Sequence, residues 1–173
     1  MGILLNSGNT EFEEAVNAEI YVDKTLLIEY ANRVLRTPQK YICVSRPRRF
    51  GKSMAANMLT AYYSKGCDSR ELFSPYKISE SDSFEKHLNK YNVIHINMVE
   101  YLTEAKSIEN LIKYIEDDII GEITDSMPEL VMPRRISLTK VLTSAFNQFK
   151  IPFIFIIDEW DCIFRKSSIR SEE

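Results

Sequence analysis

The sequence has little cysteine or histidine, and it contains no long apolar run. Its cysteines, Cys43, Cys67 and Cys162, are odd in number and lack the spacing of metal ligands, so they predict no zinc site. Cys43 and Cys162 flank predicted strands, and we expect both to be small core residues. For His87 and His95 we expect core or surface positions rather than catalysis. Without a signal-peptide pattern or an apolar run of about 18 residues, the sequence predicts a cytoplasmic protein.

A large excess of charge of one sign is also lacking. The 173 residues carry a net charge of −3, which favours neither a nucleic-acid partner nor a membrane surface. With 45% apolar and 27% charged residues, the composition is typical of a soluble globular protein. The length suits one domain, which we place at residues 1–164, followed by a polar tail at residues 165–173 that we expect to be disordered.

A basic segment containing Gly-Lys-Ser is the most informative motif. It runs from Ser45 to Ser53, after the apolar residues 41–44 and before a helical pattern. Strand, loop, Gly-Lys-Ser and helix is the order of a phosphate-binding loop, because the N–H groups and partial positive charge of a helix N-terminus suit a polyphosphate. However, Arg46 stands where the usual pattern has its first glycine, and Pro47 removes a backbone donor. A basic turn that merely caps a helix is therefore an alternative.

The motif defines the candidate nucleotide-binding residues. They are Arg48, Arg49, Phe50, Gly51, Lys52, Ser53 and Met54. We expect Lys52 to reach the β- and γ-phosphates and to act in catalysis, and the Ser53 hydroxyl to bind Mg²⁺. The arginines have two alternative roles, contact with the acidic face of a partner or simple solvation.

A second motif strengthens the nucleotide hypothesis. Residues 153–157 are an uninterrupted apolar run, typical of a strand buried on both faces, and Asp158 and Glu159 follow directly. α/β proteins place their ligands at this end of a parallel strand. Asp158 would hold Mg²⁺, directly or through water, and Glu159 would polarise the water that attacks the γ-phosphate. The alternative is a pair of solvated acids just past a strand.

Strand and helix patterns alternate along the chain. Strands are predicted at residues 40–45, 93–98 and 153–157. Helices are predicted at residues 11–17, 24–36 and 84–88, after the capping residues Ser107 and Ser137, and from the phosphate loop to about residue 65. This alternation predicts an α/β fold of the P-loop NTPase type, a three-layer αβα arrangement with a mainly parallel sheet.

Three segments together resemble a bacterial family, the AAA-ATPase-like proteins. They are Tyr21-Val22-Asp23-Lys24-Thr25, the segment 45–53, and Ile157-Asp158-Glu159-Trp160-Asp161. The resemblance covers residues 10–165 and accounts for Arg46, because the family's loop departs from the general pattern in the same way. It implies that Gly51, Lys52 and Ser53 contact phosphates and Mg²⁺. It also implies that Asp158 and Glu159 are the Walker B pair.

The same resemblance implies a position for residues 23–24 near the base or ribose, although a helix-capping Asp23 explains that residue equally well. In the family the chain continues past the acidic strand, often into a PD-(D/E)XK nuclease-like domain. We therefore expect this chain to be a truncated member whose sheet is incomplete at its C-terminal end. Such a sheet would expose apolar strand edges.

The function implied by the resemblance is Mg²⁺-dependent ATP binding, with hydrolysis that is weak or absent in a truncated chain. ATP and Mg²⁺ are the expected cofactors, and a homo-oligomer or a C-terminal effector domain is the expected partner. An alternative is a non-hydrolysing module that docks on a partner or self-associates. Nucleic-acid binding through Arg46, Arg48, Arg49 and Lys52 is a third hypothesis, which the acidic overall balance does not support.

Overall fold

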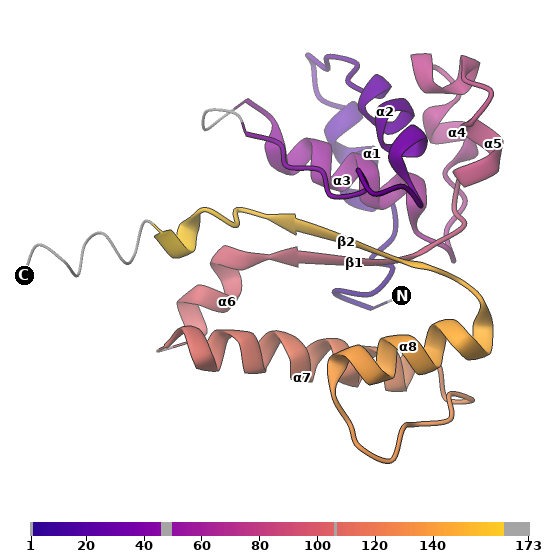
Figure 1. Ribbon diagram of the computed structural model, residues 1–173. Coiled ribbons are helices and arrows are strands. Elements are labelled where there is room, and N and C mark those ends of the chain that lie inside the picture. The colour runs from indigo at the N-terminus through magenta and orange to yellow at the C-terminus, as the bar shows by residue number, and fades with distance from the viewer. Residues whose placement is uncertain (1, 46–49, 106, 165–173) are drawn as a thin grey trace, which may run out of the picture.

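The computed structural model describes residues 2–45, 50–105 and 107–164, and Figure 1 shows them as ribbons. The elements in chain order are α1 (Thr10–Val16), α2 (Leu26–Val34), α3 (Lys52–Tyr63), α4 (Arg70–Phe73), the 3₁₀ turn η1 (Lys77–Glu80), α5 (Phe84–His87), β1 (Asn92–Asn97), α6 (Met98–Glu104), α7 (Ile108–Ser126), α8 (Leu138–Phe149) and β2 (Phe153–Asp158). The tail predicted at residues 165–173 lies outside the described residues.

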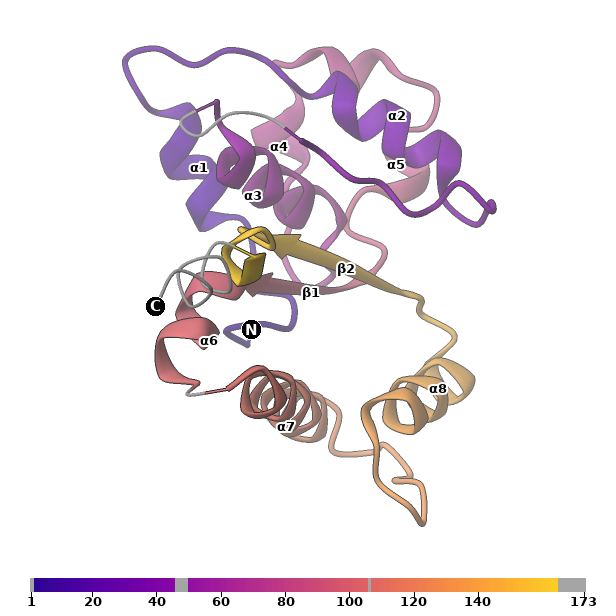
Figure 2. The same cartoon turned by 60° about the vertical axis from the view of Figure 1, so that its left-hand side comes forward.

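A parallel pair of strands forms the centre of the molecule. β1 pairs with β2 in one register, from Asn92 opposite Phe153 to Asn97 opposite Asp158. Figure 2 shows α1, α2 and α3 on one side of this pair and α7 and α8 on the other. The mixture of helices with a parallel sheet confirms the α/β class, but the described sheet has two strands where three were predicted.

Each face of the sheet has its own apolar core. Because side chains alternate along a strand, Ile94 of β1 packs into a cluster with Ile119 of α7. Val93 of β1 points the other way and belongs to a second cluster, which includes Tyr62 of α3. β1 is therefore covered by helices on both faces, as its apolar sequence indicates.

The prediction of a strand at residues 40–45 is wrong. Within the described part of the chain, this segment forms no ladder or bridge with any other segment. Tyr41 is 85% exposed and Ile42 is 41% exposed. Cys43 is exposed as well, which contradicts its expected core position, whereas Cys162 is buried as expected. Strands are held by hydrogen bonds between neighbours, so an apolar segment with no neighbouring strand stays in coil.

Most of the predicted helices are present. α7 begins after Ser107, whose hydroxyl accepts a hydrogen bond from the Asn110 N–H at 3.2 Å, so this predicted cap is confirmed. α6 follows β1 directly and was not predicted. It begins at Asn97, whose side-chain oxygen accepts from the Val99 N–H at 3.1 Å and whose amide donates to Glu100 at 2.8 Å. The side chain of Asn97 thus replaces the next step of the strand with the first turn of a helix.

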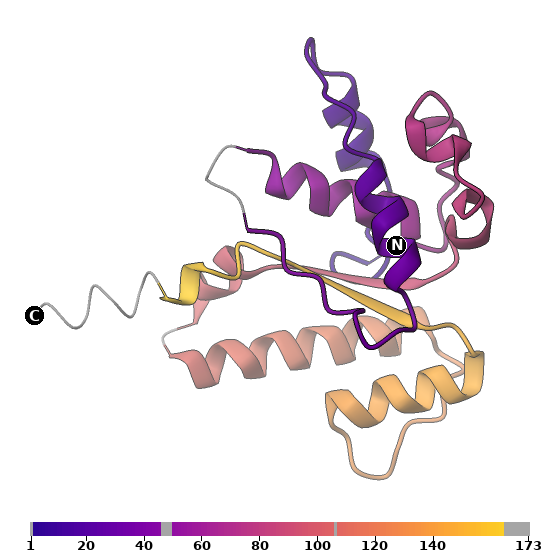
Figure 3. The same ribbon diagram turned by 45° about the horizontal axis from the view of Figure 1, so that its top comes forward.

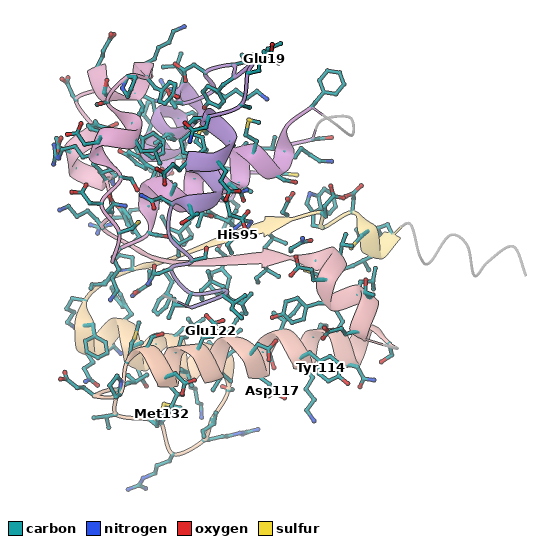
Figure 4. The ribbon with its side chains drawn as sticks, turned by 180° about the vertical axis from the view of Figure 1, so that it is seen from behind. Glu19, His95, Tyr114, Asp117, Glu122 and Met132 are labelled. Carbon is teal, nitrogen blue, oxygen red and sulfur yellow. The ribbon has the colours of Figure 1, made fainter. Side chains whose placement is uncertain are left out.

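Glu122 fastens the N-terminal segment to α7. Its carboxylate accepts hydrogen bonds from the backbone N–H groups of Ile3 at 2.9 Å, Leu4 at 2.9 Å and Leu5 at 2.7 Å. Figure 4 shows Glu122 on the side of α7 that faces the sheet. Leu5 in turn forms an antiparallel bridge with Ile94, so the N-terminal segment covers the outer edge of β1.

Replacing Glu122 by alanine should lower the stability of the fold. Three backbone donors would lose an ionised acceptor, at a cost of about 1–3 kcal/mol. For a chain of this size that cost corresponds to a fall of several degrees in Tm, about 2–4 °C per kcal/mol, in a thermal unfolding experiment. Glu116→Ala, an exposed position on the same helix, is the control. Equal melting temperatures for the two variants would contradict the role given to Glu122.

Candidate functional site

The helix that follows the phosphate loop begins at a left-handed glycine. Gly51 is the N-cap of α3 with φ 74° and ψ 39°, and its carbonyl accepts a hydrogen bond from the Ala55 N–H at 3.1 Å. Lys52 and Ser53 are the first two residues of the helix, half-buried and exposed respectively. The first turn of α3 carries no acidic side chain. No carboxylate of that turn therefore competes with an anion for the positive end of the helix dipole.

A hollow of about 350 Å³ opens beside the start of α3. Its lining comes from the loop and α3 (Phe50, Gly51, Lys52, Ala55) and from earlier in the chain (Lys24, Leu27, Val44). This volume lies at the lower end of the range of small-molecule sites, about 300–1,000 Å³. The described lining contains the ammonium groups of Lys24 and Lys52 and no carboxylate, so the hollow favours an anionic ligand.

Lys24 reaches the hollow from an anchored turn. The carboxylate of Asp23 accepts hydrogen bonds from the backbone N–H groups of Thr25 at 2.8 Å and Lys77 at 3.2 Å. Burial alone would raise the pKa of Asp23, but these hydrogen bonds outweigh burial and hold the pKa below its usual value. Asp23 therefore joins the backbone just before α2 to η1, but the N-cap of α2 is Thr25 and no side chain caps that helix, so the expectation that Asp23 caps it is wrong. The ammonium of Lys24 donates to the Phe50 carbonyl at 3.2 Å.

The acidic motif lies at the end of β2. Asp158 is 8% exposed, and its carboxylate accepts a hydrogen bond from the Glu159 N–H at 2.9 Å. Glu159 has φ 53°, in the left-handed region, and its carbonyl accepts from the Cys162 N–H at 3.0 Å. This turn ends the strand directly after Asp158. A left-handed backbone at a residue other than glycine is uncommon, and such residues concentrate at functional sites.

The two motifs lie at the same end of the molecule. α3 packs against β2. Figures 1 and 3, seen from directions 45° apart, both show the N-terminal end of α3 and the C-terminal end of β2 on the same side. An α/β fold places its ligands at this end of the parallel strands. The arrangement therefore suits a ligand that spans from the helix start to the strand end.

The structure divides the predicted site residues into two described groups. The group at the start of α3 is Phe50, Gly51, Lys52, Ser53 and Met54, of which the first three line the hollow. The group at the end of β2 is Asp158 and Glu159, and these two do not line the hollow. Arg48 and Arg49 lie outside the described residues. The candidate site thus has two parts. One is the hollow at the start of α3, and the other is the pair of carboxylates at the end of β2.

His95 is a neighbour of the site that the sequence reasoning treated as filling. It lies two residues after Val93 in β1, so the two side chains share the face of the sheet that α3 covers. Burial lowers the pKa of His95, and the negative charges of Asp158 and Glu100 act in the opposite direction. His95 is therefore held mainly as the neutral imidazole at neutral pH. The two-residue spacing from Val93, a core residue, was the sequence feature that could have placed His95 on this face.

Two of the predicted site residues carry oxygen atoms of the kind that Mg²⁺ binds. The buried Asp158 carboxylate and the exposed Ser53 hydroxyl are hard oxygen donors, the kind that Mg²⁺ prefers. Among the described residues, no group of three His, Cys, Asp or Glu side chains could hold a metal ion. Mg²⁺ commonly binds through one or two protein oxygens together with phosphates and water. A metal at this site would accordingly depend on the phosphates of a ligand.

Comparison with protein families identifies the chain. A family model described as a predicted AAA-ATPase matches residues 7–171. The chain belongs to this family. The match includes α3, the hollow beside it and β2, and membership in a predicted AAA-ATPase family is consistent with nucleotide binding. Neither a curated protein nor a solved structure matches the chain. None of the helices in the described ranges has the length and apolar character needed to cross a membrane.

Gly51→Ala should disturb the helix start in two ways. The left-handed backbone would cost about 1–2 kcal/mol. A Cβ at this position would also stand 2.6 Å from the Lys24 ammonium, which would have to leave. We expect a lower Tm and a shifted NMR resonance for the Lys24 side chain.

Gly66→Ala is the matched control for this prediction. Gly66 is also left-handed, with φ 92°, but a Cβ there meets nothing within 4 Å. The control should lose stability without moving the Lys24 resonance. A Gly51→Ala variant that leaves this resonance in place would contradict the contact between the Lys24 ammonium and the Phe50 carbonyl.

Proposed function

We propose that this chain binds Mg²⁺·ATP at the start of α3, as a nucleotide-binding domain with the three-layer P-loop arrangement. One observation carries the proposal. A left-handed glycine starts a helix whose first side chain, Lys52, lines a hollow with two ammonium groups and no carboxylate in its described lining. The start of α3, whose residues line this hollow, lies at the same end of the molecule as the C-terminal end of β2, the strand that ends in the buried Asp158. The family match supports the same conclusion.

The proposed roles follow from the position of each residue. The backbone from Phe50 to Met54 surrounds the phosphate chain, and Lys52 neutralises the charge on its terminal phosphates. Ser53 and Asp158 supply oxygen ligands to Mg²⁺, which would draw charge from the phosphate oxygens when it is bound. Arg48 and Arg49 directly precede Phe50 in the sequence, and the role proposed for them is to add positive charge to the nucleotide site.

Hydrolysis is the second part of the proposal. Glu159 follows Asp158 at the strand end, where its carboxylate would orient a water molecule and accept a proton from it. The water oxygen attacks the γ-phosphorus while the bond to the β-phosphate oxygen breaks, which gives ADP and phosphate. Lys52 stabilises the charge that develops on these oxygens. We expect slow turnover until a neighbouring chain supplies an arginine, because such a residue raises kcat about 10³–10⁵-fold in related chemistry.

Lys52→Ala should weaken Mg²⁺·ATP binding by about ten- to hundredfold. The variant removes a charge-assisted hydrogen bond, worth about 1.5–3 kcal/mol, and each 1.4 kcal/mol is about tenfold in Kd. Isothermal titration calorimetry measures the change. Lys140→Ala, an exposed lysine on α8, removes the same charge from the other side of the sheet and should bind like the wild type. Equal affinities for the wild type and Lys52→Ala would end the proposal.

Two further variants separate metal binding from hydrolysis. Asp158→Asn should reduce the difference between the affinities measured with Mg²⁺ and with a chelator, because it removes the carboxylate offered to the metal. Glu159→Gln should keep the affinity for Mg²⁺·ATP while any release of phosphate falls. Phosphate release that is unchanged in Glu159→Gln would exclude Glu159 as the residue that activates water.

A further inference from the structure

We infer that Lys24 is a second phosphate-binding residue, which contacts the loop through the Phe50 carbonyl and lines the same hollow as Lys52. The inference rests on the nucleotide site proposed above and names a contact for it. The contact between the Lys24 ammonium and the Phe50 carbonyl brings a residue from before α2 to the residue that precedes Gly51.

The neighbours of Lys24 fix the position from which its side chain extends. Asp23 accepts hydrogen bonds from the Thr25 and Lys77 backbone N–H groups. Thr25 is fully buried, and its hydroxyl oxygen accepts a hydrogen bond from the Ile78 N–H at 3.2 Å. Both residues beside Lys24 are thus tied to η1. A lysine on such a base loses less conformational freedom on binding than a lysine on a free loop, so more of its interaction energy appears as affinity.

The ammonium of Lys24 also has the donors for a phosphate. An ammonium group carries three N–H donors, and the Phe50 carbonyl takes one of them. Lys24 lines the hollow together with Lys52, so an anion in that space lies within the field of both charges. Because ionised acceptors form stronger hydrogen bonds than neutral ones, a phosphate oxygen competes well for the remaining donors.

The lack of a side chain at Gly51 leaves room for the Lys24 ammonium beside the start of α3. A Cβ at residue 51 would come within 2.6 Å of the Lys24 Nζ atom. The ammonium therefore occupies space that only a glycine leaves open, directly beside the start of α3. The absence of a side chain at residue 51 thus permits both the left-handed backbone and the approach of a second cation.

The test is the affinity of Lys24→Met for Mg²⁺·ATP and for inorganic tripolyphosphate, measured by calorimetry at two salt concentrations. We expect both ligands to bind about tenfold more weakly, which corresponds to the loss of one charge-assisted hydrogen bond. The dependence of affinity on salt should also become shallower than in the wild type. Lys24→Arg should retain most of the affinity because it keeps the charge. Lys140→Met, which removes an exposed lysine of α8 on the other side of the sheet, should leave both affinities unchanged.

Two results would overturn the inference. Unchanged tripolyphosphate affinity in Lys24→Met would do so, and if ATP binding were weakened at the same time, Lys24 would contact the base or ribose instead. Lys24→Gln, which retains polarity, serves the same comparison if the methionine variant does not fold. Lys52→Ala distinguishes a failure of the Lys24 role from a failure of the proposed nucleotide site. If it loses binding while Lys24→Met does not, only the role of Lys24 fails. If it binds like the wild type, the nucleotide site fails and this inference fails with it.

Discussion

Parallel pairing of β1 with β2 is the constraint on which the rest of the structure depends. The shared register places Asn97 opposite Asp158 at the carboxyl end of the pair. It also gives the sheet two faces, one packed against α3 and the other against α7 and α8. Because α3 lies on the same sheet that carries Asp158, the helix start and the acidic strand end are held at one end of the molecule by a single core.

The candidate site combines the positive end of a helix, a lysine ammonium and a carboxylate, and each of these has a separate structural cause. The positive end of α3 follows from the left-handed Gly51 that starts the helix. The Lys24 ammonium is present because Asp23 and Thr25 tie its turn to η1. The buried Asp158 carboxylate ends β2, a strand that packs against α3 and turns sharply at Glu159. Each part therefore depends on a different piece of tertiary structure, although all of them face a common ligand in our proposal.

Local sequence patterns predicted much of this fold. The cap at Ser107 and the apolar run that becomes β2 were readable because their causes lie within a few residues. The segment 40–45 has a similar apolar pattern, yet it is coil, because a strand requires a partner and the sequence of a segment does not say whether one is adjacent. α6 was missed although Asn97 and Glu100 form a helix-start pattern, since the strand predicted at residues 93–98 included this start.

The composition of the site was less predictable than its motifs. Gly51, Lys52 and Asp158 were identified from local context, whereas the contact of Lys24 with Phe50 joins residues 26 positions apart and depends on how α2 packs. Leu27 and Val44 were not predicted as site residues for the same reason. Short-range patterns reveal which groups can do chemistry, and packing between distant segments decides which of them meet.

The coverage of the two outer strand edges has a directional consequence. The edge of β1 is closed by the N-terminal segment, which Glu122 holds in place, while within the described ranges no strand or bridge pairs with the far side of β2. Among the described residues, the backbone of β2 that faces away from β1 is therefore the edge of this sheet at which a further strand could pair. A polypeptide that joined there would sit next to the strand that ends in Asp158, so growth of the sheet and the surroundings of the acidic pair are physically linked.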